Sequence, residues 1–447
     1  MSQRLFGLTL FLLLVSHASA AGGPFAWLPI PLPAAVSHLG WQIGVLLLLP
    51  VLVVISWWLE ETAHRLKREN NKPASSRHPK TKGGWTWGET AVTLPLAALS
   101  GLVLLRLRPE TVYLGAMLAL GWFVYLYLAN HPTWQQNRLW RVLAVVLLVQ
   151  GTVALAQFLL QRELGLAWLG EPALDLLVEG TSVAERNGQN WLRAYGLNSH
   201  PNQLGLLLMA LCLLIWPNRH QANRWWRWLF CLDLIAGVVG LLVSLSRSAW
   251  VGLLLGGLVY AVHRRGKGPL HRREFALPLA ILAAGVLLFA LAYGDVMAGR
   301  LLGLDSPLES RSLWERQRDL GLAWQLLRER PFLGVGLGQY LAAATVLDPA
   351  AAQVHNVPLL IGAELGVVGL VLWLIFWLWP LWRYGRLASF APATAVWVGL
   401  ILMALVHPEP SLALPKGAVL WGVAAAQWVS PLHPSTPAPQ LKQESRS

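Results

Sequence analysis

The stretch Gln353-Val354-His355-Asn356, followed by VPLLIGAELGVVGLVLWLIFWLW (357–379), decides the fold class of this chain. The run 357–379 carries one ionisable side chain, Glu364, and exceeds the about 20 residues that a helix needs to cross a bilayer. A histidine at the point where a polar segment enters such a helix is well placed for proton transfer near neutral pH. Its chemistry depends on the side of the membrane that it faces.

Similar apolar runs recur along the whole chain. Hydrophobic residues make up 55% and charged residues 13% of the 447 positions, which excludes an ordinary water-soluble domain. The sequence predicts a single all-α domain over 1–447, a polytopic bundle of about twelve transmembrane helices with a large periplasmic loop that contains short helices. The predicted spans are 5–20, 39–58, 88–105, 110–129, 141–160, 202–216, 228–245, 248–262, 275–293, 357–379, 391–406 and 414–430.

The first apolar segment, 1–20, is similar to a signal peptide. Arg4 precedes an apolar core, and Ala18-Ser19-Ala20 has the small residues of a cleavage site. Retention as a short first helix is the preferred interpretation, and cleavage is the alternative. Both place the following chain on the same side of the membrane, so the predicted topology does not depend on the choice.

Basic segments give the orientation. Cytoplasmic loops collect Lys and Arg, and the segment 64–82 carries seven of them. Taking it as cytoplasmic places the basic segments 217–228, 263–274 and 383–386 on the same side, together with both termini and the Pro-rich tail 431–447, which reads as disordered. The opposite, periplasmic side of a bacterial inner membrane then receives two long loops, 161–201 and 294–356.

A few charged residues fall on this outer side close to the membrane. Arg193 and His200 lie in WLRAYGLNSHPNQLG, Arg247 in the tight turn SLSRSAW, Arg311 early in a basic segment, and His355 before the run 357–379. Each also has a structural explanation. These are lipid contact for Arg247, pairing with Glu179 or Glu185 for Arg193, a helix start for His200 and His355, and pairing with Glu309 or Glu315 for Arg311.

Together these residues suit an anionic, membrane-anchored substrate. Guanidinium groups bind phosphate oxygens in a bidentate fashion and stay charged at physiological pH. A lipid-linked pyrophosphate fits, because its departure builds negative charge that fixed cations stabilise, while a histidine takes the proton of an attacking hydroxyl. We expect no cofactor and no metal, and the net charge of +13 follows from the cytoplasmic loops without a nucleic acid partner.

At these residues the chain resembles the O-antigen ligase and O-antigen polymerase group, integral-membrane glycosyltransferases of the GT-C type. The resemblance rests on RAYGLNSHPNQLG, SLSRSAWVGL and RERPFLGVGLGQY…HNVPLLIGAELGVVGL, and covers about residues 190–380. It implies transfer of a glycan from undecaprenyl pyrophosphate to an acceptor hydroxyl, such as that of lipid A-core, at the outer face of the inner membrane and without a metal. The remaining partners would be membrane lipids.

Carried over by position, the resemblance implies that His355 is the catalytic base and that Arg247 and Arg193 bind the pyrophosphate. Arg311 is a looser match for a third pyrophosphate contact, because arginines cluster in its segment. Possible secondary residues are His200, Asn356 and Glu364, the last of which also fits a buried structural partner.

Three alternatives stay open. A ligase and a polymerase share these motifs, so the acceptor is a lipid A-core sugar, a growing glycan or a protein. A solute transporter, such as one for inorganic carbon, would need a polar path through the bundle, and charged residues within the predicted spans are few. A purely structural membrane protein would leave the outer cations without a purpose.

Overall fold

The computed structural model describes residues 2–15, 53, 56, 88–108, 111–176, 181–186, 189–217, 224–264, 270–302, 307–408 and 415–429. Within them the chain is mostly helical. The elements are α1 (Ser2–Val15), α3 (Thr90–Arg106), α4 (Val112–Asn130), α5 (Pro132–Trp134), the π-helix η2 (Gln135–Leu139), α6 (Trp140–Leu160), η3 (Ala167–Leu169), β1 (Val183–Arg186), β2 (Gln189–Leu192), α7 (Pro201–Ile215), α8 (Arg224–Val243), α9 (Arg247–Arg264), α10 (Leu270–Leu302), α11 (Pro307–Glu329), α12 (Tyr340–Leu347), α13 (Val357–Tyr384), η5 (Ala388–Phe390), α14 (Ala391–Val406) and α15 (Pro415–Ala426).

The predicted spans that fall within the described residues coincide with helices. Among the described residues, four helical segments are long and apolar enough to cross a membrane, namely Trp140–Leu160, Ala276–Arg300, Val357–Tyr384 and Ala388–Val406. Among the described residues, shorter apolar helical stretches of 10–17 residues are Gln3–Val15, Thr90–Arg106, Leu114–Asn130, Pro201–Ile215, Trp228–Val243 and Lys416–Ala426, so the number twelve stays a prediction. The predicted span 39–58, apart from Val53 and Ser56, and the segments 64–82 and 431–447 lie outside the described residues.

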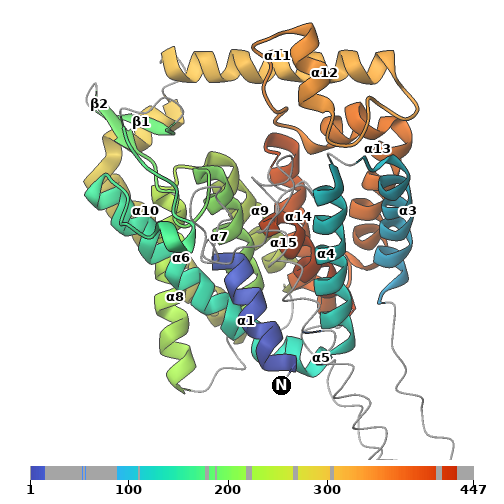
Figure 1. Cartoon of the computed structure of the whole chain (residues 1–447). Helices are drawn as coiled ribbons and strands as arrows, with labels where there is room; N and C mark the ends of the chain where they lie inside the picture. The colour runs from blue at the N-terminus through green and yellow to red at the C-terminus, as the bar shows by residue number, and fades with distance from the viewer. Residues whose placement is uncertain are drawn as a thin grey trace, which may run out of the picture.

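Most helices stand side by side, whereas α11 and α12 lie across one end of the bundle, at the top of Figure 1. The antiparallel hairpin of β1 and β2 lies toward the same end, which we call the loop-rich end. Two details differ from the expectation of an all-α chain with short helices in its loop. The loop 161–201 forms this hairpin, and α11 has 23 residues.

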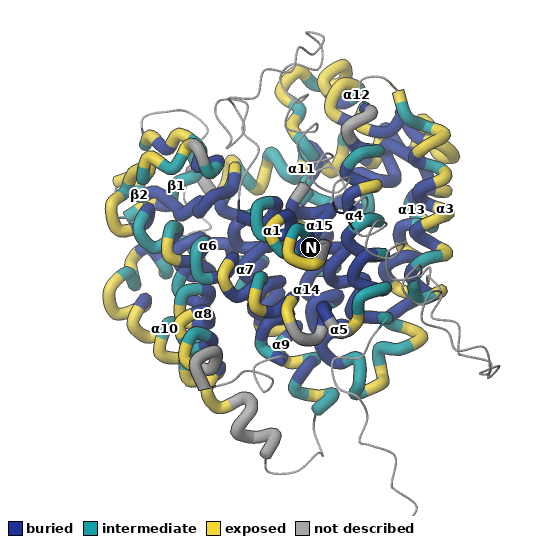
Figure 2. The backbone as a smooth tube through the Cα atoms, turned by 60° about the horizontal axis from the view of Figure 1, so that its bottom comes forward, coloured by how far each residue is buried: buried dark blue, intermediate teal, exposed yellow. Residues whose placement is uncertain are grey.

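The core is built around α7, every residue of which is buried apart from Gln203 at its start. This helix packs against α6, α8, α9 and α14, and Figure 2 shows it in dark blue in the middle of the bundle. The helix α10 lies at the edge of the bundle, since only 11% of the residues in the apolar stretch of Ala276–Arg300 are buried. Close approach of α6 and α8 needs a glycine, because a Cβ on Gly151 would collide with the backbone of Ala236.

The helix α13 is broken at Gly366, where φ is 69° and ψ is −170°. The segment before α12 adds its backbone to this break: the N–H of Val335 donates to the carbonyl of Ala363 at 2.9 Å, and that of Gly336 to Glu364 at 3.0 Å. A Cβ on Gly366 would also collide with the backbone of Phe332. Only glycine combines this conformation with this contact, so the break fixes the segment before α12 on α13.

Candidate functional site

The segment RAYGLNSH enters the bundle as buried irregular chain, with residues 192–198 all buried. Irregular backbone at this depth needs internal hydrogen-bond partners, which amide side chains of α6 supply. Oε1 of Gln157 accepts from the N–H groups of Tyr195 (3.1 Å) and Gly196 (2.7 Å), and Oε1 of Gln150 accepts from that of Leu197 at 3.0 Å. The segment therefore has a fixed path between β2 and α7.

Arg193 is 4% exposed and binds the tight turn between α8 and α9. Its Nε donates to the carbonyl of Ser244 at 3.0 Å and its Nη2 to that of Leu245 at 3.4 Å. Leu245 has a φ of 52°, a conformation that needs such support. Burial lowers the pKa of Arg193 well below its usual range, and the positive charges of Arg300 and Arg247 lower it further. The described contacts of Arg193 are thus with neutral protein oxygens.

Two further arginines surround the same turn. Nη1 of Arg247, the first residue of α9, donates to the carbonyl of Arg300 at 3.1 Å. Nε of Arg300 donates to the carbonyl of Leu245 at 3.3 Å. Both side chains are half-buried, so both retain accessible surface. The structure brings Arg193, Arg247 and Arg300 together around one turn.

Two histidines beside these arginines use both ring nitrogens within the protein. Asn202 places its Oδ1 on Nη2 of Arg193 (2.9 Å), which turns its amide nitrogen toward Nδ1 of His407 at 3.3 Å. Nδ1 of His407 is then an acceptor, and its Nε2–H donates to Ser248 Oγ at 2.7 Å. Nδ1 of His200 likewise accepts from the N–H of Asn202 at 3.1 Å, as the cap of α7.

The electrostatic environment keeps both of these rings neutral. Burial, followed by the charges of Arg193 and His355, lowers the pKa of His200 to about 3. Burial, followed by the charge of Arg316, lowers the pKa of His407 to about 2. Each ring is therefore a fixed neutral member of the network rather than an available base.

His355 lies in the same cluster, with its ring centroid 6.1 Å from that of His407. Its Nδ1 is buried without a hydrogen-bond partner among the described residues, although the Gln353 backbone is near enough to raise its pKa. Burial and then the charge of Arg316 lower this pKa, and the carboxylate of Asp319 opposes them. A half-buried, neutral imidazole is suited to accept a proton.

Asn356 holds the backbone next to this histidine. Its Oδ1 accepts from the N–H of Leu359 at 2.8 Å and so caps α13. Its Nδ2 donates to the carbonyl of Leu405 at 2.9 Å, which joins the start of α13 to the end of α14. Asn356 therefore fixes the relative positions of His355 and His407.

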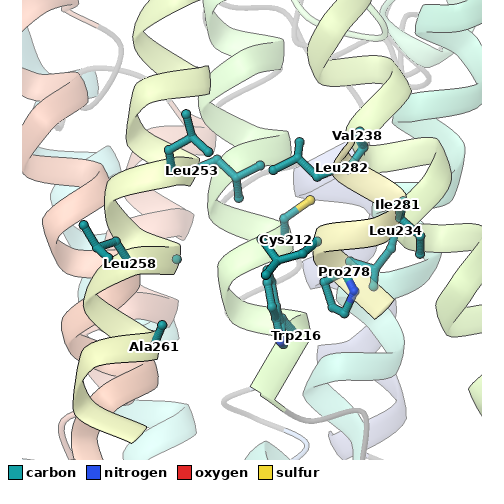
Figure 3. A pocket seen from close by; sticks show the side chains of 13 residues that line it. Cys212, Trp216, Leu234, Val238, Leu253, Leu258, Ala261, Pro278, Ile281 and Leu282 are labelled. Carbon is teal, nitrogen blue, oxygen red and sulfur yellow. The ribbon is translucent and has the colours of Figure 1, made fainter. Parts of the chain in front are cut away.

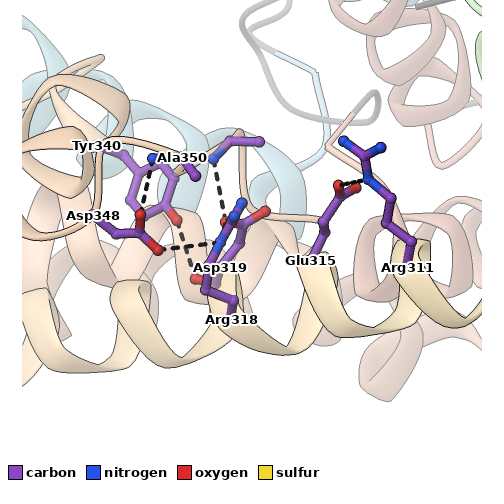
Figure 4. Close-up of polar contacts among 8 residues, drawn as sticks. Arg311, Glu315, Arg318, Asp319, Tyr340, Asp348 and Ala350 are labelled. Atoms are coloured by element: carbon purple, nitrogen blue, oxygen red, sulfur yellow. Dashed lines mark hydrogen bonds and ion pairs between the residues drawn. The ribbon is translucent and has the colours of Figure 1, made fainter.

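The helix α11 presents two arginines differently. Arg311 is exposed, with 72% of its side chain accessible, and its Nε pairs with Glu315 at 2.8 Å, as drawn in Figure 4. Arg316 is half-buried, and its charge lowers the pKa of Arg193, His200, His355 and His407. The structure thus brings Arg316 to the cluster and shows Arg311 in the alternative ion pair that the sequence left open.

Glu364 lies apart from these residues, in the break of α13. Its side chain is buried and its Oε1 accepts from the N–H of Tyr340 at 3.3 Å. Its described contacts are those of a structural partner that ties α12 to α13.

A separate cavity of about 320 Å³ lies between α7, α8, α9 and α10. Figure 3 shows its apolar lining, including Cys212, Trp216, Leu253, Pro278 and Leu282. Cys212 and Trp216 lie at the end of α7 away from His200, and none of the residues that line the cavity belongs to the arginine and histidine cluster. Within the described part of the chain, no three His, Cys, Asp or Glu side chains are grouped closely enough to hold a metal ion.

Residues 232–374 match the family model described as O-antigen ligase. Over these residues the chain is similar to the O-antigen ligase family. The match runs from α8 into α13 and includes Arg247, Arg300, Arg316 and His355, although it spans about a third of the chain. No curated protein matches the chain. Family members are membrane proteins, and the family indicates a ligase or glycosyltransferase type of enzyme in polysaccharide biosynthesis.

Sequence reasoning missed three residues of the cluster: Arg300, Arg316 and His407. The sequence predicts Arg300 in the loop 294–356, yet α10 continues to Leu302 through a distorted Tyr293. His407 directly follows the predicted span 391–406 on the outer side, and this position was the available signal. Nothing in the sequence distinguished Arg316 from its neighbouring arginines.

Proposed function

We propose that this protein is an O-antigen ligase-like glycosyltransferase that moves a glycan from an undecaprenyl-pyrophosphate donor to an acceptor hydroxyl on the periplasmic face. The observation that carries the proposal is a cluster of arginines beside a histidine at the loop-rich end: the charges of Arg247 and Arg316 act on Arg300, and that of Arg316 also acts on His355. Clustered guanidinium groups repel one another, so a ligand with several negative charges stabilises them. A membrane-anchored pyrophosphate is such a ligand.

In this mechanism the arginines bind the pyrophosphate and stabilise the negative charge that grows on it as the glycosidic C–O bond breaks. The buried Arg193 adds its charge to the cluster and holds the turn that precedes Arg247. His355 accepts the proton of the acceptor hydroxyl while the hydroxyl oxygen forms the new bond to the sugar. The products are the glycosylated acceptor and the free lipid pyrophosphate.

The test is transfer by purified protein in lipid nanodiscs, with a polyprenyl-pyrophosphate glycan as donor. Lipid A-core and a second copy of the donor glycan serve as separate acceptors. Glycosylated lipid A-core is the expected product. Elongation of the donor glycan alone would assign polymerase activity instead, and transfer to neither acceptor with uptake of a solute would overturn the proposal.

A matched pair of variants tests whether Arg247 belongs to the donor site. Arg247→Ala removes a guanidinium from the cluster, whereas Arg386→Ala removes one after the opposite end of α13. Transfer should fall about 100-fold in the first and stay near the wild-type rate in the second, in line with the loss of one charge-stabilising group. Equal rates in the two variants would remove Arg247 from the donor site.

A further inference from the structure

Asp319 is a buried carboxylate of α11 that sequence reasoning did not single out. Its side chain is 1% exposed. Oδ1 accepts from Nη2 of Arg318 at 2.8 Å and from the backbone N–H of Ala352 at 3.2 Å. Figure 4 shows this carboxylate between α11 and the chain that leaves α12.

The contact with Ala352 connects Asp319 to the base. Ala352 precedes His355 by three residues, in a segment without helix or strand. Oδ1 of Asp348 accepts from the N–H of Ala350 at 2.9 Å, and the hydroxyl of Tyr340 donates to the carbonyl of Asp319 at 3.0 Å. The segment that presents the imidazole is therefore tied to one turn of α11.

Two buried atoms in this region lack hydrogen bonds. Oδ2 of Asp319 and Nδ1 of His355 are both buried without a partner among the described residues. Buried polar atoms are normally hydrogen-bonded, so two buried atoms without such a bond call for a functional explanation. The charge of Asp319 also raises the pKa of His355, in opposition to burial and to Arg316.

We propose that Asp319 is a positioning residue for His355: its Oδ1 fixes the segment that carries the imidazole, and its negative charge stabilises the ring when it takes up the proton of the acceptor hydroxyl. This inference rests on the proposed function for the identity of that proton. A carboxylate that supports a histidine base in this way keeps the base strong within a cationic pocket.

Several other charged or titratable groups act on His355. Arg316 and Glu315 face it from α11, His407 from the end of α14, and His200 from the start of α7. These groups are unchanged when Asp319 is replaced. A shift in the titration of His355 after that replacement is then the effect of the missing carboxylate.

The decisive experiment follows the modification of His355 by diethyl pyrocarbonate against pH, with the peptide quantified by mass spectrometry, on the full chain in nanodiscs. D319N keeps an oxygen acceptor for Ala352 and removes the charge. The midpoint should fall by about one pH unit in D319N because an anion no longer stabilises the protonated ring. The matched control is D348N, which removes the other carboxylate that contacts Arg318 and should leave the midpoint at the wild-type value.

The transfer rate is measured on the same samples. In D319N, kcat should fall while KM for the donor changes little, and the acid limb of the pH profile should move with the modification midpoint. An unchanged midpoint in folded D319N would overturn the positioning role. A shifted midpoint, together with transfer that does not depend on His355, would support the positioning role and overturn the proposed function.

A second variant covers the case in which D319N does not fold. Ala352→Pro removes the backbone N–H that donates to Oδ1 of Asp319, and it leaves the side chains of Asp319 and His355 unchanged. It should lower kcat and leave the midpoint unchanged. Wild-type kcat in this variant would overturn the positioning role.

Discussion

The two long segments at the loop-rich end of this protein are held in different ways. The segment before α7 is fixed by neutral amide side chains, Gln150 and Gln157, which satisfy its buried backbone. The segment between α10 and α13 is fixed by charged groups, Arg318, Asp319 and Asp348, and by the break in α13. The comparison teaches that neutral hydrogen bonds hold the first segment in place, while the second carries the charged and titratable groups to which we assign the proposed chemistry.

The largest expected effect in the second segment follows removal of the base. His355→Ala should lower the rate of glycan transfer by at least about 100-fold, the usual contribution of a general base. The thermal unfolding midpoint should stay near that of the wild type, because Nδ1 of His355 makes no described hydrogen bond that would be lost. Transfer assays and unfolding in the same detergent check both statements.

Arg316 and Arg311 allow a half-buried and an exposed arginine to be compared within one helix, α11. Arg316→Ala should lower transfer by about 10- to 100-fold, since a charge that stabilises the leaving group is removed. Arg311→Ala should change it less than about twofold, because an exposed pair within a helix contributes only a few tenths of a kcal/mol. Equal losses in both variants would contradict the assignment of Arg316 to the cluster.

The first segment should respond in stability instead. Gln157→Ala leaves the buried N–H groups of Tyr195 and Gly196 without their acceptor, at a cost of about 1–3 kcal/mol each. The unfolding midpoint should fall, and transfer should fall in proportion to the folded fraction. A variant with wild-type stability and no transfer would contradict the separation of the two segments.

The smallest effect concerns pH. A general base works in its neutral form, and burial with Arg316 lowers the pKa of His355 below the usual value of about 6.5. Transfer should therefore be insensitive to pH around neutrality and decline only as the pH falls below about 6.5. A rate that rises as the solution becomes more acidic would indicate an acid rather than a base.

The amino-acid sequence predicted the helices well because a transmembrane helix is a matter of length and apolar content, and the run 357–379 shows both. The side of the membrane on which His355 lies stays a prediction from the basic loops. The sequence did not show which arginine of α11 joins the cluster, because packing decides which face of the helix is buried. Arg311 and Arg316 are five residues apart, which corresponds to a rotation of about 140° around the helix, so one is exposed and the other is half-buried. Arg300 failed for another reason, since α10 continues past its apolar stretch.

The joint at Gly366 was equally beyond prediction. The quoted segment RERPFLGVGLGQY contains GVGLG (334–338), but these glycines do not reveal which part of the chain they contact. The partner is the broken backbone of α13, which takes hydrogen bonds from Val335 and Gly336. Long-range pairing of this kind needs the three-dimensional arrangement.

The most direct test of the central claim separates donor binding from turnover. Binding of a polyprenyl-pyrophosphate glycan to the purified His355→Ala and Arg316→Ala variants is measured beside their transfer rates. If the arginines bind the pyrophosphate and His355 is the base, His355→Ala binds the donor with nearly wild-type affinity and does not transfer it, whereas Arg316→Ala binds it at least about tenfold more weakly. Loss of donor binding in His355→Ala, with wild-type binding in Arg316→Ala, would contradict the account.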